Sequence, residues 1–295
     1  MVKSYTSPRA IHSVIEFVEW SLDLAMSKDR KIIFRGHSNS TYKNSPSVLR
    51  DANLKENENI MLSELVSLHP EDFGKDTTAL EQLVRAQHYG LPTRLLDVSF
   101  NPLAALYFAC REKEEYDGEV IVFFVDDARI KQYYSDTVSC LTNLAFLSKS
   151  QKDEISTNIN RMLRARKFSD RDEIKKLRNS KPMKKLLHFI RQEKPQFRSE
   201  IQPGSLRQFV VVKPKRSNRR IIAQSGAFIV FGVVPELGDS GTPNESKKFE
   251  IMKVLVPKES KNSILDQLDR LSINASTMFP DIDQTAIFLK NQYKN

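Results

Sequence analysis

One segment of twelve residues concentrates side chains that are able to do chemistry. AQHYGLPTRLLD, residues 86–97, contains His88, Tyr89, Arg94 and Asp97 around a Gly–Leu–Pro turn. A histidine can act as a general acid or base, and a planar guanidinium can pair with a phosphate or a carboxylate. The same side chains can instead lock a corner of the core, because buried polar groups need hydrogen-bond partners. The segment therefore predicts either a ligand pocket or a structural corner.

The neighbouring sequence predicts the elements that position this segment. A capping box at Thr78–Glu81 opens a helix that delivers His88 and Tyr89 near its C-terminal end. Gly90 is well placed to terminate that helix, since glycine readily adopts the left-handed conformation found there. A second helix is expected to begin at Asn101–Pro102 and to be apolar on nearly all sides, which is typical of a buried helix.

The remaining patterns predict a first half that is rich in helices, a basic helical insert and a second half that is rich in strands. We expect a helix from Ser7–Pro8 with Ile11, Val14, Ile15, Val18 and Leu22 on its buried face. Strands are expected at 31–35, ended by Gly36, and at 119–125, and a helix is expected at about 60–68. Residues 151–194 are expected to be helical with a break near 180–182. Further strands are expected at 208–213, 221–231 and 248–256, and two helices at 261–271 and 282–291.

Because helices and strands do not alternate regularly, the sequence predicts an α+β protein rather than a doubly wound sheet. We expect one elaborated domain over 1–295, with a core at about 30–130 and 200–295. A basic helical insert is expected at about 150–195.

The composition favours a globular protein of a reducing compartment. Of the 295 residues, 40% are hydrophobic, and no apolar run approaches the length of a membrane helix. The first residues lack the apolar region of a signal peptide, and the cysteines are only Cys110 and Cys140. We therefore expect a cytoplasmic protein with no membrane partner.

Positive charge is concentrated in two segments. The net charge is +9, while residues 161–194 hold 13 Lys or Arg against 4 Asp or Glu, and KPKRSNRR at 213–220 adds five cations. Such clusters attract nucleic acids by counterion release, although most charge runs are simply solvated faces. The residues expected to contact nucleic acid are Arg164, Arg166, Lys167, Lys175, Lys176, Lys184, Lys185, Lys215, Arg216, Arg219 and Arg220.

Several common motifs are absent from the sequence. There is no P-loop, no G-x-G-x-x-G dinucleotide fingerprint and no G-x-S-x-G nucleophile elbow. The five histidines are never paired at metal-ligand spacing, and the two cysteines are far apart. We therefore expect no metal.

Four pieces of the chain together resemble the bacterial FRG-domain family, which is named after a Phe-Arg-Gly motif. They are Phe34-Arg35-Gly36, AQHYGLPTRLLD followed by NPLAALYFA, RRIIAQSGAFIVFG, and MFPDIDQTAIFLK. The sequence departs from the family pattern at His37, where glutamine is usual after the motif. The long basic stretch is a second departure.

The resemblance implies an ADP-ribosyltransferase-like mixed sheet and an NAD-consuming toxin of a toxin–antitoxin or phage-defence system. NAD would be a substrate, and Arg35, Gly36, Arg94 and Gln224 are the expected cofactor-binding residues. His88, Tyr89 and Asp97 are the expected catalytic residues: histidine for a ribose hydroxyl, tyrosine for stacking on nicotinamide, and a carboxylate to polarise the ribose. Glu250 and Asp283 remain alternatives for that carboxylate.

The favoured function is therefore ADP-ribosylation of a nucleic acid, with RNA preferred. A metal-independent nuclease with His88 as acid or base is an alternative, and a non-enzymatic nucleotide- or nucleic-acid-binding module is another. An acidic antitoxin protein is a possible partner. The structural alternatives are that Arg35 pairs with Asp97, or that Arg94 and Asp97 bridge each other.

Overall fold

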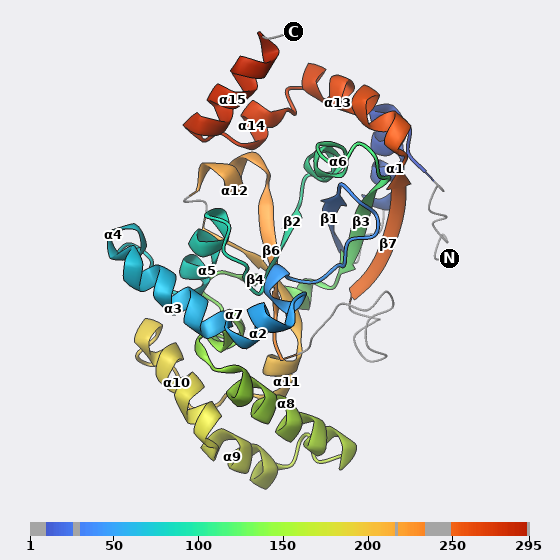
Figure 1. Cartoon of the computed structure of the whole chain (residues 1–295). Coiled ribbons are helices and arrows are strands. Elements are labelled where there is room, and N and C mark those ends of the chain that lie inside the picture. Colours follow the sequence, from blue (N-terminus) through green and yellow to red (C-terminus); the bar gives the residue numbers. More distant parts are fainter. Residues whose placement is uncertain (1–9, 26–29, 216–217, 234–248, 294–295) are drawn as a thin grey trace.

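A curled seven-stranded sheet organises the protein in the computed structural model, which describes residues 10–25, 30–215, 218–233 and 249–293. The sheet order is β4-β5-β6-β2-β1-β3-β7, and every neighbouring pair is antiparallel except the parallel pair β4–β5. Its strands are β1 (Lys31–His37), β2 (Leu95–Ser99), β3 (Gly118–Val125), β4 (Ile130–Gln132), β5 (Phe209–Lys213), β6 (Gly226–Phe231) and β7 (Phe249–Val256). With its many helices, this mixed sheet confirms the α+β class (Figure 1).

The inner face of the sheet is filled by apolar side chains from strands far apart in the sheet order. Phe209 on β5 and Phe249 on β7 stand edge to face with ring centroids 4.7 Å apart. Four other strands separate β5 from β7, so this contact requires the sheet to curl until its two ends meet. Ile33, Ile121 and Phe123 on the central strands are fully buried in the same cluster.

Two groups of helices cover different parts of the outer face of the sheet. The helices α1 (Val14–Ala25), α6 (Pro102–Cys110) and α13 (Lys261–Arg270) pack beside β1, β3 and β7. The helices α5 (Ala79–His88), α7 (Asp136–Thr142) and α10 (Lys181–Glu193) cover β5 and β6. Figure 1 shows α6 and α13 at one end of the molecule and α10 at the other.

The remaining described α-helices include the rest of the insert. They are α2 (Ala52–Glu56), α3 (Glu58–Leu68), α4 (Pro70–Phe73), α8 (Lys149–Arg164), α9 (Arg171–Asn179), α11 (Pro203–Arg207), α12 (Arg219–Ala223), α14 (Ala275–Met278) and α15 (Ile282–Gln292). The helices α8, α9 and α10 form the basic insert, and the strands on both sides of it in sequence belong to the same sheet.

Three expectations from the sequence are corrected. The first helix begins at Val14. Of the expected buried residues, Ile11 and Val14 are buried and Val18 packs against the core, whereas Ile15 and Leu22 are exposed and Phe17 and Leu24 are buried in their place. The earlier start was predicted from Ser7 as a cap with Pro8 at the first helical position, and Ser7–Pro8 lies outside the described residues.

The strand expected at 31–35 does not stop at Gly36 but runs to His37. The long strand expected at 221–231 is divided, because residues 219–223 form α12 and only 226–231 pair in the sheet. Asn218 caps α12 by accepting a hydrogen bond from the Arg220 amide, a local signal that outweighs the β-branched pair Ile221–Ile222.

Gly36 is required by the approach of α6 to β1. A Cβ atom at this position would lie 1.9 Å from the Ala105 carbonyl oxygen and 2.6 Å from the Ala109 nitrogen. The small residues of PLAALYFAC therefore let the helix lie directly on the strand. The glycine of the Phe-Arg-Gly motif is thus explained by packing.

The sheet is weakest where β1 meets β2. These two strands share a single pair of residues, Phe34 with Ser99, whereas β1 and β3 pair over seven positions. Beyond Phe34, β1 and β2 therefore diverge, and β2 keeps its hydrogen-bonded register only with β6. Residues at this divergence are able to reach a space that a continuous sheet would close.

The described residues include no helix with the length and apolar character that crossing a bilayer requires.

Candidate functional site

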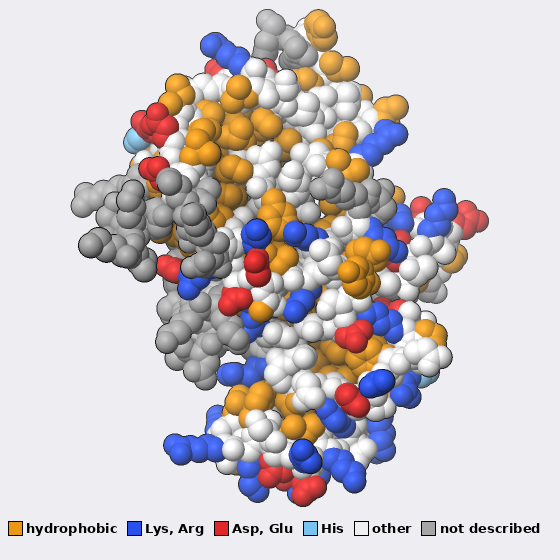
Figure 2. All heavy atoms as spheres, turned by 180° about the vertical axis from the view of Figure 1, so that it is seen from behind, with side chains coloured by type: hydrophobic (Ala, Val, Ile, Leu, Met, Phe, Trp, Pro, Cys, Tyr) orange, Lys and Arg blue, Asp and Glu red, His pale blue; other side chains and the backbone are white. Residues whose placement is uncertain are grey.

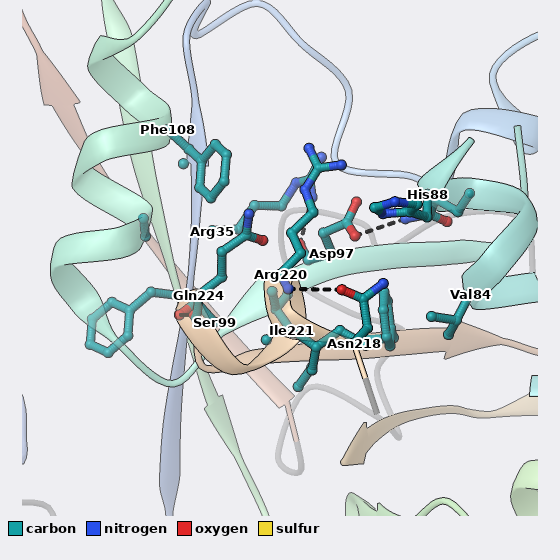
Figure 3. A pocket seen from close by; sticks show the side chains of 18 residues that line it. Arg35, Val84, His88, Asp97, Ser99, Phe108, Asn218, Arg220, Ile221 and Gln224 are labelled. Carbon is teal, nitrogen blue, oxygen red and sulfur yellow. Dashed lines mark hydrogen bonds between the residues drawn. The ribbon is translucent and has the colours of Figure 1, made fainter. Parts of the chain in front are cut away.

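A cavity of about 270 Å³ lies where β1 and β2 diverge. Its walls come from β1, β2, β6, α5, α6 and α12 (Figure 3). The lining residues are Phe34, Arg35, Gly36, Val84, Gln87, His88, Asp97, Val98, Ser99, Ala105, Phe108, Asn218, Arg220, Ile221, Gln224, Gly226, Ala227 and Phe228. We call it the Arg35 cavity. It gathers Arg35, Gly36, His88, Asp97 and Gln224, all of which the sequence analysis placed in one site.

Arg35 spans the gap between the two diverging strands. Its Nη1 atom donates to the backbone carbonyl of Asp97 at 2.5 Å, and its Nε atom donates to His37 Nε2 at 2.9 Å. Burial lowers the pKa of the guanidinium to about 10, against the opposing effect of Asp97, so Arg35 is charged at neutral pH. Arg35 thus bonds to the main chain of β2 and not to the Asp97 carboxylate.

Asp97 presents a carboxylate that a neighbouring amide orients. Gln87 Nε2 donates to Asp97 Oδ1 at 2.8 Å, and Thr93 Oγ1 donates to Gln87 Oε1. Because the threonine hydroxyl occupies the amide oxygen, the amide nitrogen must face the carboxylate. The Asp97 side chain itself is exposed, so this hydrogen bond holds its direction while leaving an oxygen accessible.

His88 and Tyr89 separate at the end of α5. His88 is the last residue of this helix and lines the Arg35 cavity. Tyr89 is 63% exposed and is not among the lining residues, and its ring meets the His88 ring edge to face at a centroid distance of 5.1 Å. The expected stacking of Tyr89 on a ligand inside the cavity is therefore corrected: its ring supports His88 from outside.

Arg220 is the second cation of the cavity, although the sequence analysis had assigned it to nucleic-acid binding. It projects from α12, and its guanidinium lies 4.3 Å from the centroid of the Phe279 ring. Burial lowers the pKa of Arg220, and the charge of Asp97 opposes this effect. Figure 3 shows Arg35, Arg220 and Asp97 directed toward a common space, with His88 facing them from α5.

Gln224 and Ser99 fasten the wall that carries Arg220. Ser99 Oγ donates to the Gln224 carbonyl at 2.6 Å, and Gln224 Nε2 donates to the Met278 carbonyl at 2.9 Å. Ser225, which follows, has a φ of 47° and turns the chain from α12 into β6. Gln224 therefore lines the cavity while tying α12 to the C-terminal helices.

Arg94 is placed in the core, which corrects its assignment to cofactor binding. It is 2% exposed and does not line the Arg35 cavity. Its Nε and Nη2 atoms donate to the two carboxylate oxygens of Glu58 at 2.8 and 2.5 Å, and Lys152 adds a third charge at 2.6 Å from Glu58 Oε2. Arg94 therefore ties Glu58 of α3, and through it Lys152 of the insert, to the chain just before β2, and it does not pair with Asp97.

Most of the predicted nucleic-acid contacts are exposed on the insert. The exposed cations of the insert are Arg164, Arg166, Lys167, Lys175, Lys176, Lys184 and Lys185, and Arg219 is exposed on α12. Lys215 is partly buried and bridges Glu81 at 2.7 Å, and Arg216 lies outside the described residues. Figure 2 shows Lys and Arg side chains gathered at the lower end of the molecule, over the insert.

The alternative carboxylates do not join the cavity as described. Glu250 on β7 pairs with Arg30 at 2.7 Å and is not a lining residue. The side chain of Asp283 lies outside the described part of α15. Within the residues that the structure describes, no group of three or more His, Cys, Asp or Glu side chains gathers as metal ligands would.

Sequence reasoning missed the residues that orient the charged groups. Gln87 lies inside the AQHYG segment, and the i to i+10 contact with Asp97 leaves no periodic signal. Phe108 was interpreted as core, and it also lines the cavity. Asn218 was overlooked because its capping role depends on α12, which the apolar pattern had predicted as strand.

The comparisons with known proteins match one segment of the chain to a known family. The FRG domain family model matches residues 30–118, which include β1, α5, β2 and α6. No curated protein and no solved structure matches the chain. The matched segment supplies Arg35, His88 and Asp97, whereas Arg220 and Gln224 lie outside it.

Proposed function

From its membership of the FRG-domain family, we propose that this chain is an ADP-ribosyltransferase that uses NAD as substrate in the Arg35 cavity. The observation that carries the proposal is the convergence of Arg35, Arg220, Asp97 and His88 on one cavity from four different elements. Two cations, a carboxylate and an imidazole are the groups that a charged dinucleotide and a cation-like transition state require. The ADP-ribosyltransferase-like character of the sheet belongs to the same proposal.

The two guanidinium groups bind the diphosphate in this proposal. Arg35 uses two of its five N–H donors on Asp97 and His37, so three remain for phosphate oxygens. The Arg220 guanidinium is held by the face of Phe279, which leaves its donors for the ligand. Partial burial of both groups strengthens such pairs relative to exposed ones.

Asp97 and His88 act on the ribose. The bond between ribose C1 and nicotinamide breaks with its electron pair, so nicotinamide leaves as a neutral molecule and positive charge develops on the ribose. The Asp97 carboxylate stabilises that charge and then accepts the proton released when the target's nucleophile forms its bond to C1. His88 hydrogen-bonds a ribose hydroxyl and thereby fixes the sugar.

The size of the cavity matches part of the dinucleotide. About 270 Å³ lies just below the range of about 300–1,000 Å³ that is common for small-molecule sites. The cavity therefore holds the nicotinamide riboside and the diphosphate, while the adenosine extends beyond it. Three phenylalanines, Phe34, Phe108 and Phe228, line the cavity and supply aromatic surface for packing against the nicotinamide ring.

We further propose that the basic insert binds the phosphate backbone of the target, a nucleic acid with RNA preferred. The insert combines exposed cations on α8, α9 and α10 with few acidic neighbours. Such contacts fix the position of a nucleic acid without reading its sequence. An acidic antitoxin would compete for the same surface. Toxicity that results from modification of the nucleic acid would explain a role in defence.

The test is incubation of the full chain with NAD labelled on its adenylate phosphate, together with RNA, DNA or protein. We expect label in RNA, with loss of transfer by at least about 100-fold in Arg220→Ala, because an arginine–phosphate pair and its orientation are both removed. Arg270→Ala is the control: Arg270 is exposed at the end of α13, does not line the cavity and is not among the expected nucleic-acid contacts.

The other outcomes select the alternatives. Strand cleavage without NAD supports the metal-independent nuclease, and retention of nucleic acid without any chemistry supports a binding module. A folded Arg35→Ala protein that keeps full toxicity in a bacterial host contradicts both enzymatic functions. The nucleic-acid contact is measured separately: Lys175→Gln/Lys184→Gln/Lys185→Gln should lower the slope of log affinity against log salt by about two to three.

A further inference from the structure

A buried chain of hydrogen bonds leads from the Arg35 cavity into the sheet. Arg35 and His37 are two residues apart on β1 and therefore lie on the same face of the sheet. His37 is directly opposite Glu119 on β3, and their side chains are only 2% and 4% exposed. Arg35 Nε lies 2.9 Å from His37 Nε2, and His37 Nδ1 lies 3.1 Å from Glu119 Oε1.

The direction of each hydrogen bond follows from the groups involved. The Nε atom of arginine only donates, so His37 Nε2 must accept and carries no proton. The Nδ1 atom then carries the proton and donates to the Glu119 carboxylate. His37 is thus neutral in this arrangement, in agreement with the lowering of its pKa by burial, which outweighs the opposing effect of the hydrogen bond that it donates to Glu119.

We propose that His37 is a positioning residue for Arg35, which holds the guanidinium so that its free edge faces the ligand phosphates. The proposal rests on the proposed function only for the identity of the ligand. With Nε bound to His37 and Nη1 bound to the Asp97 carbonyl, two separate atoms of the guanidinium plane are fixed, so its rotation about the side chain is blocked. Glu119 acts one step further away by fixing the His37 tautomer.

The charged surroundings make this contact sensitive to protonation of His37. Arg35 and Arg50 oppose a positive charge on His37, Glu119 favours it, and Lys253 lies 3.8 Å from Glu119. The Tyr42 ring meets the His37 ring edge to face, with the ring centroids 6.1 Å apart. A protonated His37 has two donors and no acceptor, so it repels the Arg35 Nε donor. Acidification should therefore release Arg35, and the effect is confined to pH values below the ordinary histidine pKa of 6.5.

Two variants separate this role from simple packing. His37→Gln keeps an acceptor for Arg35 and a donor for Glu119, since the two polar atoms of the amide are spaced like those of the imidazole. His37→Leu fills the volume but offers no acceptor. We expect the ADP-ribose affinity of the full chain, measured by calorimetry at pH 7.5, to fall by about 10- to 100-fold in His37→Leu and to stay within about 2-fold in His37→Gln.

The pH profile supplies a readout that packing alone does not move. Between pH 7.5 and 5.5, the wild-type affinity should decline more steeply than that of His37→Gln, because only the imidazole titrates while the ligand phosphates titrate equally in both. Parallel profiles, or a His37→Gln protein as weak as His37→Leu, overturn the proposal.

A measurement without ligand keeps the inference independent of the proposed function. The ¹⁵Nε–H signal of Arg35, assigned through its loss in Arg35→Lys, should be protected from exchange in the wild type and in His37→Gln but exposed in His37→Leu. Unchanged protection in a folded His37→Leu protein refutes the positioning role. Failure of wild type to bind ADP-ribose, with the protection pattern as expected, refutes the proposed function alone.

Discussion

Replacement of Arg94 by methionine should destabilise the protein without altering the Arg35 cavity. Arg94 and Glu58 have side chains that are each 3% exposed, and two of the guanidinium nitrogens bond to the two carboxylate oxygens. Removing one member of a buried ion pair leaves an uncompensated charge and costs about 3–5 kcal/mol. Lys152 still neutralises part of the Glu58 charge, so we expect about 3 kcal/mol.

Urea unfolding provides the assay. With an m-value of about 3 kcal/mol/M, a loss of about 3 kcal/mol moves the midpoint down by about 1 M. The double variant Glu58→Met/Arg94→Met should recover most of this loss, because both members of the pair are then apolar and Lys152 is able to extend to solvent. The ADP-ribose affinity of folded Arg94→Met should remain within about 2-fold of wild type.

Two results would refute this reasoning. A midpoint within about 0.2 M of wild type would mean that the buried pair contributes little. An Arg94→Met protein with normal stability that no longer binds ADP-ribose would show that Arg94 contacts the ligand, as the sequence analysis expected.

Three further predictions follow from described contacts. Gly36→Ala should cost about 3 kcal/mol, seen as a lowered melting temperature, because its Cβ meets the α6 backbone, whereas Gly226→Ala, with its nearest neighbour at 3.5 Å, should be tolerated. Gln87→Leu should slow ADP-ribosyl transfer by about 10-fold, measured by label release, because Asp97 loses its only orienting amide among the described residues; an unchanged rate contradicts this role. The folded-state pKa of Glu58 is lowered by Arg94 and Lys152 against the effect of burial, so its stabilisation is present above about pH 4.5 and is lost as the pH falls through the folded pKa. Urea midpoints between pH 7 and 3 should therefore fall more steeply in wild type than in Glu58→Met/Arg94→Met.

The sequence predicted those parts of the fold that depend on local signals. The capping box at Thr78, the cap at Asn101 and the buried strand at Gly118–Val125 were all located to within a residue or two, because each is determined by neighbouring residues. The first helix was misjudged because its buried face is decided by contact with α13 and α6 and not by periodicity alone.

The candidate site was predicted only in part. Arg35, His88 and Asp97 were grouped from a family resemblance, and the structure places them around one cavity. Arg94 was misassigned because its partner Glu58 is 36 residues away and carries no local mark. Arg220 was not recognised because it lies in a run of cations, KPKRSNRR, and composition alone does not distinguish one cation of such a run from another.

The divergence of β1 and β2 has a consequence for the order in which the protein is made. One wall of the cavity is synthesised early, on the segment that matches the FRG domain, and the opposite wall only with α12 and β6. A nascent chain that ends in α10 contains the whole matched segment yet lacks Asn218, Arg220 and Gln224. Translation must therefore pass the entire basic insert before the two halves of the cavity can meet, so an incomplete product has no finished cavity.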